Sequence, residues 1–180
     1  DQVRYYPYPF FVRGDDISFS LANQFDTATL SGVVSFQDDF SAKESPLIMY
    51  LDLRSHLHHH LAQIGMQLGW FKSAWVVGRL FLRSIVRMHY DSANAQLTAW
   101  EDVMRGPEFF RDNADMMIKR PQITADIQSE KWQACDPATL PPPCPLKPPG
   151  ALMTYAMKFT LNGHLIPFWR VATQRIALAD

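Results

Sequence analysis

The sequence has few cysteines, no long apolar run and no excess of charge of either sign. Its 180 residues contain only Cys135 and Cys144, which excludes the dense disulfide framework of a small secreted domain and indicates reducing surroundings. No uninterrupted apolar run approaches the roughly 20 residues that cross a bilayer. The formal net charge of -1 argues against nucleic acid as the main partner, because no basic field covers the chain.

Several catalytic motifs are also missing from the sequence. It contains no Gly-rich phosphate loop, no Cys-x-x-Cys pair and no Gly-x-Ser-x-Gly elbow, so we set aside the chemistries that depend on them. What is present is apolar: 47% of the residues are hydrophobic, enough for a real core in about one domain. The chain opens at Asp1 without an initiator Met or a signal peptide, and we expect it to be a piece of a longer protein.

Two short apolar stretches near the amino end are each followed by acidic residues. The run from Phe10 to Arg13 predicts a buried strand that ends at Gly14, directly before Asp15 and Asp16. A second strand is predicted from Thr29 to Phe36, and the polar residues after it are Gln37, Asp38 and Asp39. A short helix is expected between the two strands.

Helical patterns fill the middle of the chain. Ser45 and Pro46 form a good helix start, and apolar spacing predicts a helix to about Gln63. One or two helices are expected between Trp70 and Met104, another from Glu108 to Lys119, and a short one within 121–133. The sequence therefore predicts a helical layer.

A proline-rich stretch divides this layer from the carboxyl end. Seven of the 13 prolines lie between Pro137 and Pro149, which excludes regular structure and indicates a linker. Beyond it, residues 152–160 alternate like a strand, Asn162-Gly163 predicts a hairpin turn, and a returning strand is expected from Leu165. We predict an α+β chain with four parts: 1–45 with the acidic pair, a helical subdomain at 46–136, a linker at 137–150, and the start of a β unit at 151–180.

The adjacent carboxylates of Asp15 and Asp16 are the most chemically specific feature. Two neighbouring carboxylates repel each other, so their presence indicates a base, a metal contact or an acceptor for a sugar hydroxyl. The alternative is structural, because Asp is also favoured in the first turn of a helix. The residues alone leave both interpretations open.

Four histidines, His56, His58, His59 and His60, lie on the helix predicted after Pro46. Asp52, His56 and His60 are four residues apart and share one face, a spacing that can bind zinc. Against a metal site, no Glu accompanies the histidines as in metalloprotease helices, and a His-rich helix face is often only solvated.

A basic stripe follows on the next predicted helix, formed by Lys72, Arg79, Arg83 and Arg87. It lies beside aromatic residues that include Trp70, Phe71 and Trp75, so the helix resembles one that rests on an anionic membrane surface. The alternative is an ordinary amphipathic helix that packs its apolar face on its own domain.

Three ordered segments carry a resemblance to a known family. Residues 10–19 (FFVRGDDISF), 32–40 (GVVSFQDDF) and 50–55 (YLDLRS) resemble the acceptor half of family 2 glycosyltransferases, in particular the galactofuranosyltransferase-like branch. Residues 101–110 (EDVMRGPEFF) are similar to the helical segment that follows the catalytic domain in that branch. The resemblance covers roughly residues 10–113.

The resemblance implies part of an inverting GT-A enzyme that moves a sugar, galactofuranose in that branch, from a nucleotide-sugar donor to a glycan acceptor. Asp16 would be the general base, and Asp15 would orient the acceptor. The other residues expected to bind substrate are Arg13, Gly14, Gln37, Asp38, Asp39 and Arg54. The family also uses a divalent metal, Mg²⁺ or Mn²⁺, with most ligands in a donor-binding N-terminal half that this chain lacks.

Two positions depart from the galactofuranosyltransferase pattern. Ser18 stands where that branch commonly has a Glu, and Gln37 aligns with a metal-binding His. A Gln carbonyl can still accept a hydroxyl or water, so Gln37 remains a candidate metal ligand. We expect a cytoplasmic location, with peripheral contact to the inner face of the membrane. We also expect that the protein can form homo-oligomers. The competing hypothesis is a non-enzymatic helical interaction or membrane-surface module whose acidic pairs only cap helices.

Overall fold

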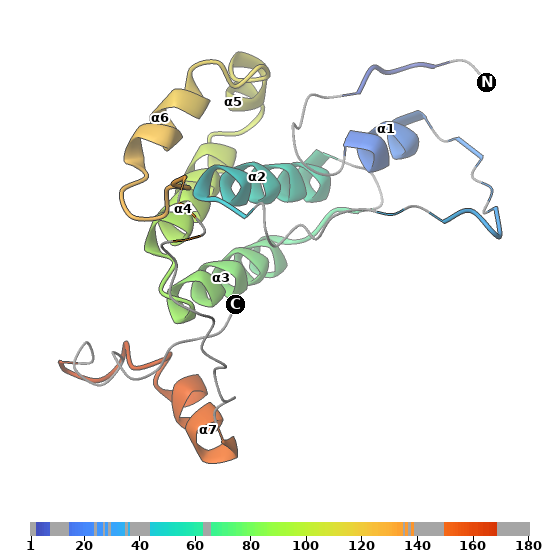
Figure 1. The fold of residues 1–180 in the computed structure, drawn as a ribbon. Helices are drawn as coiled ribbons and strands as arrows, with labels where there is room; N and C mark the ends of the chain where they lie inside the picture. Colours follow the sequence, from blue (N-terminus) through green and yellow to red (C-terminus); the bar gives the residue numbers. More distant parts are fainter. Residues whose placement is uncertain are drawn as a thin grey trace.

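The computed structural model is helical (Figure 1). It describes residues 3–7, 15–23, 25–26, 28, 30–34, 36, 44–62, 66–134, 136, 138 and 150–168. Among these residues 62% are in helices and none is in a strand. The predicted α+β fold, with the acceptor half of a GT-A sheet, is therefore wrong for the part of the chain that the structure describes.

The first helix, α1 (Asp15–Asn23), begins at the acidic pair. Asn23 at its end fastens the preceding extended segment: its Oδ1 accepts the Arg4 and Tyr5 N–H groups at 2.7 and 3.0 Å. Its Nδ2 donates back to the Tyr5 carbonyl at 3.0 Å. A single side chain thus satisfies three backbone groups and holds residues 3–7 beside α1.

The long central helix is α2 (Pro46–Ala62). Pro46 is compatible with a first helical turn because its missing N–H has no partner there in any helix. The Ser45 hydroxyl accepts the N–H of Ile48 at 3.3 Å, which satisfies one of the unpaired donors at the helix start. The predicted helix from Pro46 is confirmed, and its predicted end at about Gln63 lies one residue beyond the observed one.

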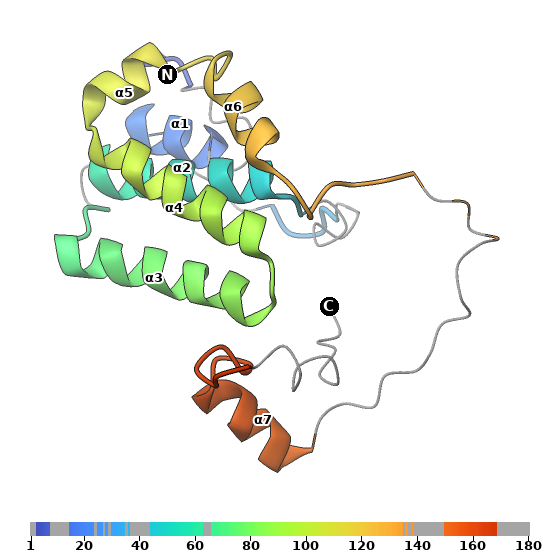
Figure 2. The ribbon, with the colours of Figure 1, turned by 90° about the vertical axis from the view of Figure 1, so that its left-hand side faces the viewer.

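Two helices follow, α3 (Trp70–Val86) and α4 (Tyr90–Met104). The break between them contains Met88 at a positive φ of 63°, a conformation that a helix cannot continue. There the N–H of His89 donates to the carbonyl of Ser84 at 2.9 Å. The chain therefore turns back, and α4 lies between α2 and α3 (Figure 2).

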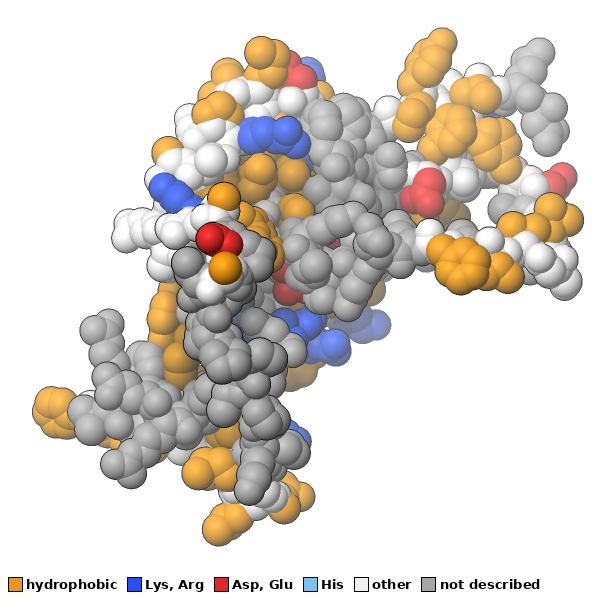
Figure 3. All heavy atoms as spheres, viewed as in Figure 1, with side chains coloured by type: hydrophobic (Ala, Val, Ile, Leu, Met, Phe, Trp, Pro, Cys, Tyr) orange, Lys and Arg blue, Asp and Glu red, His pale blue; other side chains and the backbone are white. Residues whose placement is uncertain are grey.

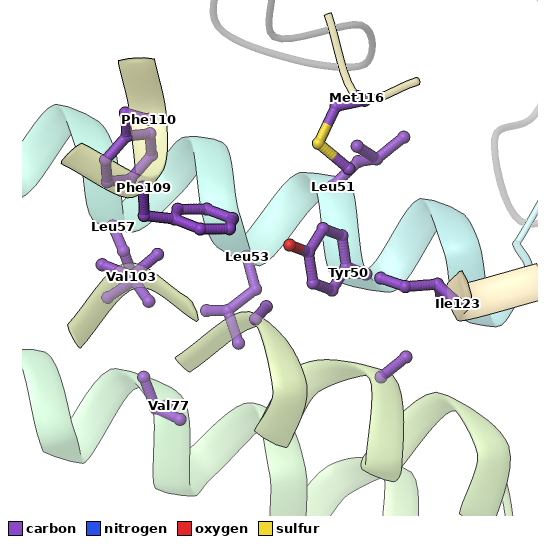
Figure 4. Close-up of a cluster of buried hydrophobic side chains, with 12 residues drawn as sticks. Tyr50, Leu51, Leu53, Leu57, Val77, Val103, Phe109, Phe110, Met116 and Ile123 are labelled. Atoms are coloured by element: carbon purple, nitrogen blue, oxygen red, sulfur yellow. The ribbon is translucent and has the colours of Figure 1, made fainter. Parts of the chain in front are cut away.

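The core forms where α2 packs on α4, with the residues of α5 and α6 covering its outer side (Figure 4). Tyr50 and Leu57 of α2 are fully buried, as is Ala99 of α4. The small side chains of α4 let the two helices approach closely, while larger ones fill the space around them. The remaining core members are Leu51, Leu53, Val77, Ala95, Val103, Phe109, Phe110, Met116 and Ile123.

The helix predicted from Glu108 to Lys119 is found only in its first part, whereas the short helix predicted within 121–133 is confirmed. Gly106 at φ 85° ends the preceding segment, and α5 (Pro107–Asp112) follows with Pro107 in its first turn. Met116 interrupts the helical conformation with a positive φ of 58°, and its side chain is buried in the core. Helix α6 (Lys119–Asp126) begins after it. The prediction failed because burying the Met116 side chain requires a turn that helical spacing alone does not reveal.

The predicted carboxyl-terminal β unit is wrong where the structure describes it. Residues 151–159 form a helix, α7 (Ala151–Phe159), and the residues around Asn162 and Gly163 form successive turns. The segment contains strong helix formers such as Ala, Leu and Met. A helix satisfies its backbone groups locally, whereas a lone hairpin without a third strand is marginal in water.

The strand predicted from Thr29 to Phe36 is also not observed. Its described residues contain a turn at Ser31 and Gly32 and no strand, and Gly32 has φ 88°. A β-rich sequence needs a partner strand to satisfy its backbone, and the described part of the chain offers none. The strand predicted at 10–13 and most of the linker at 137–149 lie outside the described residues.

Candidate functional site

Asp16 lies in the first turn of α1, where its side chain is exposed. One carboxylate oxygen, Oδ1, accepts the N–H of Ile17 at 2.8 Å. Among the described residues the carboxylate has no other hydrogen-bond partner. Asp15 begins the same helix, and its side chain is outside the described set, as are Arg13 and Gly14.

A cavity of about 500 Å³ lies beside α1, between α2 and α3. Ile17, the neighbour of Asp16, lines it together with Asp52, His56, His59, Trp75, Val76, Arg79 and Leu80. The walls combine apolar side chains with one carboxylate, two imidazoles and one guanidinium. Such a cavity can accept a polar molecule while excluding part of its water.

The histidines of α2 are partly brought together by the helix. His56 Nε2 and His60 Nε2 are 3.2 Å apart, and His60 Nδ1 lies 2.9 Å from the Met66 carbonyl. Burial lowers the pKa of His56, and the neighbouring His60 lowers it further. Burial likewise lowers the pKa of His58 to about 4, because its ring packs on Phe110 with the centroids 4.7 Å apart.

The described residues contain no preformed metal site. No group of three or more His, Cys, Asp or Glu side chains there is arranged to hold a metal ion. The histidine pair on α2 supplies two nitrogens, which is fewer than the four ligands typical of a structural zinc site. Gln37, Asp38 and Asp39, the other expected ligands or substrate contacts, lie outside the described residues.

Arg54, expected to bind substrate, is fully buried in α2. Its guanidinium donates to the Asn113 carbonyl at 3.2 Å and lies 5.5 Å from the centre of the Phe110 ring. These contacts join α2 to the segment after α5. In this position Arg54 has no surface on which a substrate could rest.

A buried polar network was missed by the sequence analysis. Asp102, only 1% exposed, accepts the Tyr50 hydroxyl at 2.8 Å, and Lys119 Nζ lies 2.9 and 2.8 Å from its two oxygens. Burial raises the pKa of Tyr50, and the hydrogen bond to Asp102 raises it further, so the phenol stays protonated and donates. No local signal could reveal the network, because its members are far apart in sequence.

Asp91 and Glu130 form a reciprocal cap at the start of α4. Glu130 Oε1 accepts the N–H groups of Asp91 and Ser92 at 2.7 and 3.3 Å. Asp91 Oδ2 in turn accepts the N–H groups of Gln128, Ser129 and Glu130 at 2.7–3.0 Å. Burial alone would raise the pKa of Asp91, but these donors outweigh it and lower the pKa. The cap anchors the residues after α6.

A second cavity, of about 550 Å³, opens beside this cap. Its lining residues come from the start of α2, the end of α3 and residues 130–132, and they include Arg83, Arg87, His89, Glu130 and Trp132. Cations and the carboxylates of Glu44, Asp52 and Glu130 line it together, and Arg87 Nη1 lies 3.7 Å from Glu44 Oε2. Because carboxylates lie among the cations, the cavity presents no field of one sign to a charged ligand.

The basic stripe lies along the outside of α3. Lys72, Arg79 and Arg83 are exposed, and Arg87 is half-buried at the end of the helix. No helix in the described part of the chain is long and apolar enough to cross a membrane. Comparison of the chain with protein-family models, with curated proteins and with solved structures gives no match.

Proposed function

We propose that this chain is part of an inverting glycosyltransferase and that Asp16 is its general base. The proposal rests on the resemblance of residues 10–19, 32–40 and 50–55 to family 2 glycosyltransferases. The observation that supports it is the exposed carboxylate of Asp16, with one oxygen fixed by a backbone N–H at 2.8 Å and the other without a partner among the described residues. An acceptor hydroxyl can hydrogen-bond only to a carboxylate oxygen that has room for a further partner.

The chemistry assigned to Asp16 is a single proton transfer. In an inverting reaction the acceptor oxygen bonds to the anomeric carbon as the bond from that carbon to the nucleotide phosphate breaks. The hydroxyl proton must leave at the same time, and a carboxylate within hydrogen-bond reach can take it. The hydrogen bond from the Ile17 N–H holds the carboxylate in one orientation, which favours a fixed direction of approach.

The neighbouring cavity is a suitable place for the acceptor. Ile17 connects Asp16 to its wall, and Asp52, His56 and His59 supply hydrogen-bond acceptors and donors there. Sugar hydroxyls need both kinds of partner. Asp15 would orient the acceptor in this arrangement. We assign no substrate contact to Arg54, because it is buried.

Donor and metal binding belong to a different part of the proposed enzyme. In the resembled family an Asp-x-Asp motif in the donor-binding half holds the nucleotide sugar with Mg²⁺ or Mn²⁺. The described residues of this chain do not fit such a metal site, since they contain no cluster of three ligands. We therefore assign no step of the reaction to a metal held by the described residues. The partners proposed are the donor-binding half, a nucleotide sugar and a glycan acceptor.

The test is the substitution Asp16→Asn in the protein expressed from its complete coding sequence. Asn is about as good as Asp at a helix start, so α1 should keep its structure, but an amide cannot take the proton. We expect sugar transfer to fall by about 10²–10⁴-fold. Nucleotide binding, measured by calorimetry, should change by less than about twofold.

Asp112→Asn is the matched control, because Asp112 is exposed and pairs only with the adjacent Arg111. It should leave transfer unchanged. Transfer by Asp16→Asn at the rate of the unmodified protein would disprove the assignment of the base. Loss of nucleotide binding would move Asp16 to the donor site instead.

The second candidate function is a non-enzymatic helical module in which Asp15 and Asp16 only stabilise the start of α1. The observation that favours it is the start of α1 at Asp15, with Asp16 bonded to the next backbone N–H. Under this hypothesis Asp16→Ala should lower stability by about 1 kcal/mol, and the complete protein should transfer no sugar from any nucleotide donor.

A further inference from the structure

Helix α3 is oriented with its larger apolar side chains outward. The residues that it buries are Ser73, Val77 and Ser84, and the Ser84 hydroxyl donates to Gln96 Oε1 of α4 at 3.0 Å. Phe71 and Trp75 are 85% and 73% exposed. A helix of a globular domain normally buries its most apolar face, so this arrangement needs a partner that covers the outer face.

The outer face is continuous and open. Phe71, Trp75, Gly78 and Leu82 follow one another at spacings of four, three and four residues, which places them on one side of the helix. A Cβ added to Gly78 would meet nothing within 4 Å. Leu82 is also exposed. No described part of the chain covers this strip.

Cations border the strip on one side. Lys72, Arg79 and Arg83 are exposed and lie along the helix at spacings of seven and four. They have no ion-pair partner among the residues that the structure describes, and α3 contains no Asp or Glu. The helix therefore offers aromatic side chains next to unneutralised positive charge.

The positive charge beside the strip favours some covering surfaces over others. A second copy of the chain seated symmetrically on it would bring two cationic borders together, which is unfavourable in a dry interface. An anionic lipid surface complements the border, and long basic side chains can reach phosphate groups while their stems stay on the apolar strip. The aromatic rings suit the same boundary, because Trp is favoured at the level of the headgroups.

We propose that α3 lies flat on an anionic membrane surface. Phe71, Trp75 and Leu82 enter the boundary between headgroups and acyl chains, and Lys72, Arg79 and Arg83 contact lipid phosphates. Helix α7 extends the surface: Asn162 Nδ2 after it donates to the Val86 carbonyl at the end of α3, at 2.8 Å. It carries the exposed side chains Leu152 and Phe159, and hydrophobic atoms are visible over α7 at the bottom of Figure 3.

The test measures binding of the full chain to sedimented vesicles. Vesicles of phosphatidylcholine with about 30% phosphatidylglycerol are compared with vesicles of pure phosphatidylcholine, each at two salt concentrations. The triple variant Lys72→Glu/Arg79→Glu/Arg83→Glu should lower the partition coefficient by at least about 100-fold. Binding of the unmodified chain should weaken as salt rises.

The matched control is Arg111→Glu/Arg120→Glu/Lys131→Glu. It makes the same change in net charge at exposed positions outside α3, and it should bind like the unmodified chain. A gain-of-binding variant, Gly78→Leu, places an apolar side chain into the open centre of the strip. It should raise the partition coefficient about tenfold.

Several results would overturn the proposal. These are no binding of the unmodified chain to anionic vesicles, equal binding to neutral vesicles, and equal losses in the α3 and control triple variants. A stable dimer in sedimentation velocity that Trp75→Ser dissociates would show that a second copy covers the strip. The proposal does not depend on glycosyl transfer, because vesicle binding is measured without donor or acceptor.

Discussion

Helices α2 and α3 have the same length but use their side chains in opposite ways. Each is 17 residues long. Helix α2 buries residues around most of its circumference, including the charged Arg54 and the imidazole of His59. Helix α3 is the more clearly amphipathic in sequence, yet it buries two serines and a valine and exposes Trp75 and Phe71. An amphipathic pattern therefore predicts a helix with two faces, but not which face its own domain covers.

The largest expected difference between the two helices is the effect of removing one leucine from each. Leu57 of α2 is fully buried, whereas Leu82 of α3 is 44% exposed. Leu57→Ala should lower the free energy of unfolding by about 3–5 kcal/mol, because it leaves a cavity in the core. Leu82→Ala should lower it by less than about 1 kcal/mol. Urea denaturation measures both, and similar losses would contradict the orientation of α3.

A smaller effect tests the polar anchor of α2. Lys119→Met keeps most of the side-chain volume but leaves Asp102 without the ammonium that lies 2.8 Å from it. We expect a loss of about 3 kcal/mol, since the buried carboxylate then keeps only the exposed Arg105, 3.5 Å away, as a cationic partner. The exposed Lys72→Met on α3 is the control and should change stability by less than about 0.5 kcal/mol. Equal stability of the two variants would mean that water reaches Asp102.

The pH dependence of stability tests the packing of His58 on α2. Burial lowers the pKa of this histidine from 6.5 to about 4, so the unfolded chain takes up its proton first as the pH falls. The resulting stability is complete above pH 6.5 and is lost between pH 6.5 and about 4. Because the side chain is only half-buried, we expect a loss of about 2 kcal/mol over this range.

His58→Leu is the matched variant, because Leu keeps an apolar contact with Phe110 and cannot take up a proton. Urea denaturation at pH 7, 5.5 and 4.5 should give a flatter profile for this variant. Part of the slope should remain, since the pKa of His56 is also lowered. An unchanged slope in His58→Leu would show that other groups cause the acid sensitivity.

The smallest predicted effect tests whether the outer face of α3 is open at Gly78. Gly78 lies inside the helix, and a Cβ there would meet nothing within 4 Å. Gly78→Ala should stabilise the protein by about 0.5–1 kcal/mol, because Ala loses less backbone entropy in a helix. Thermal unfolding measures the gain. A destabilised Gly78→Ala would indicate that another element packs closely on this face.

The N-terminal end of α2 was predictable because its signals are local. Ser45 and Pro46 are adjacent in sequence and act on the first turn. The same kind of signal misled the prediction at residues 151–160, where alternation suggested a strand and α7 formed instead. The choice there depends on whether a partner strand exists, and that information lies elsewhere in the chain. Asp16 and the basic stripe could be chosen as candidates from the sequence, but the cavity beside Ile17 could not be foreseen from it.

Several properties of this protein were determined by the sequence alone: the helix-forming middle of the chain, the position of the acidic pair and the cationic border of residues 72–83. These depend on neighbours within a few residues, where backbone bonding and side-chain spacing are decided. Only the tertiary structure decided that Asp102 is buried between Tyr50 and Lys119 and that the aromatic side of α3 faces outward. The physical reason is that burial depends on which distant segments pack together, and a pattern within one helix carries no information about them.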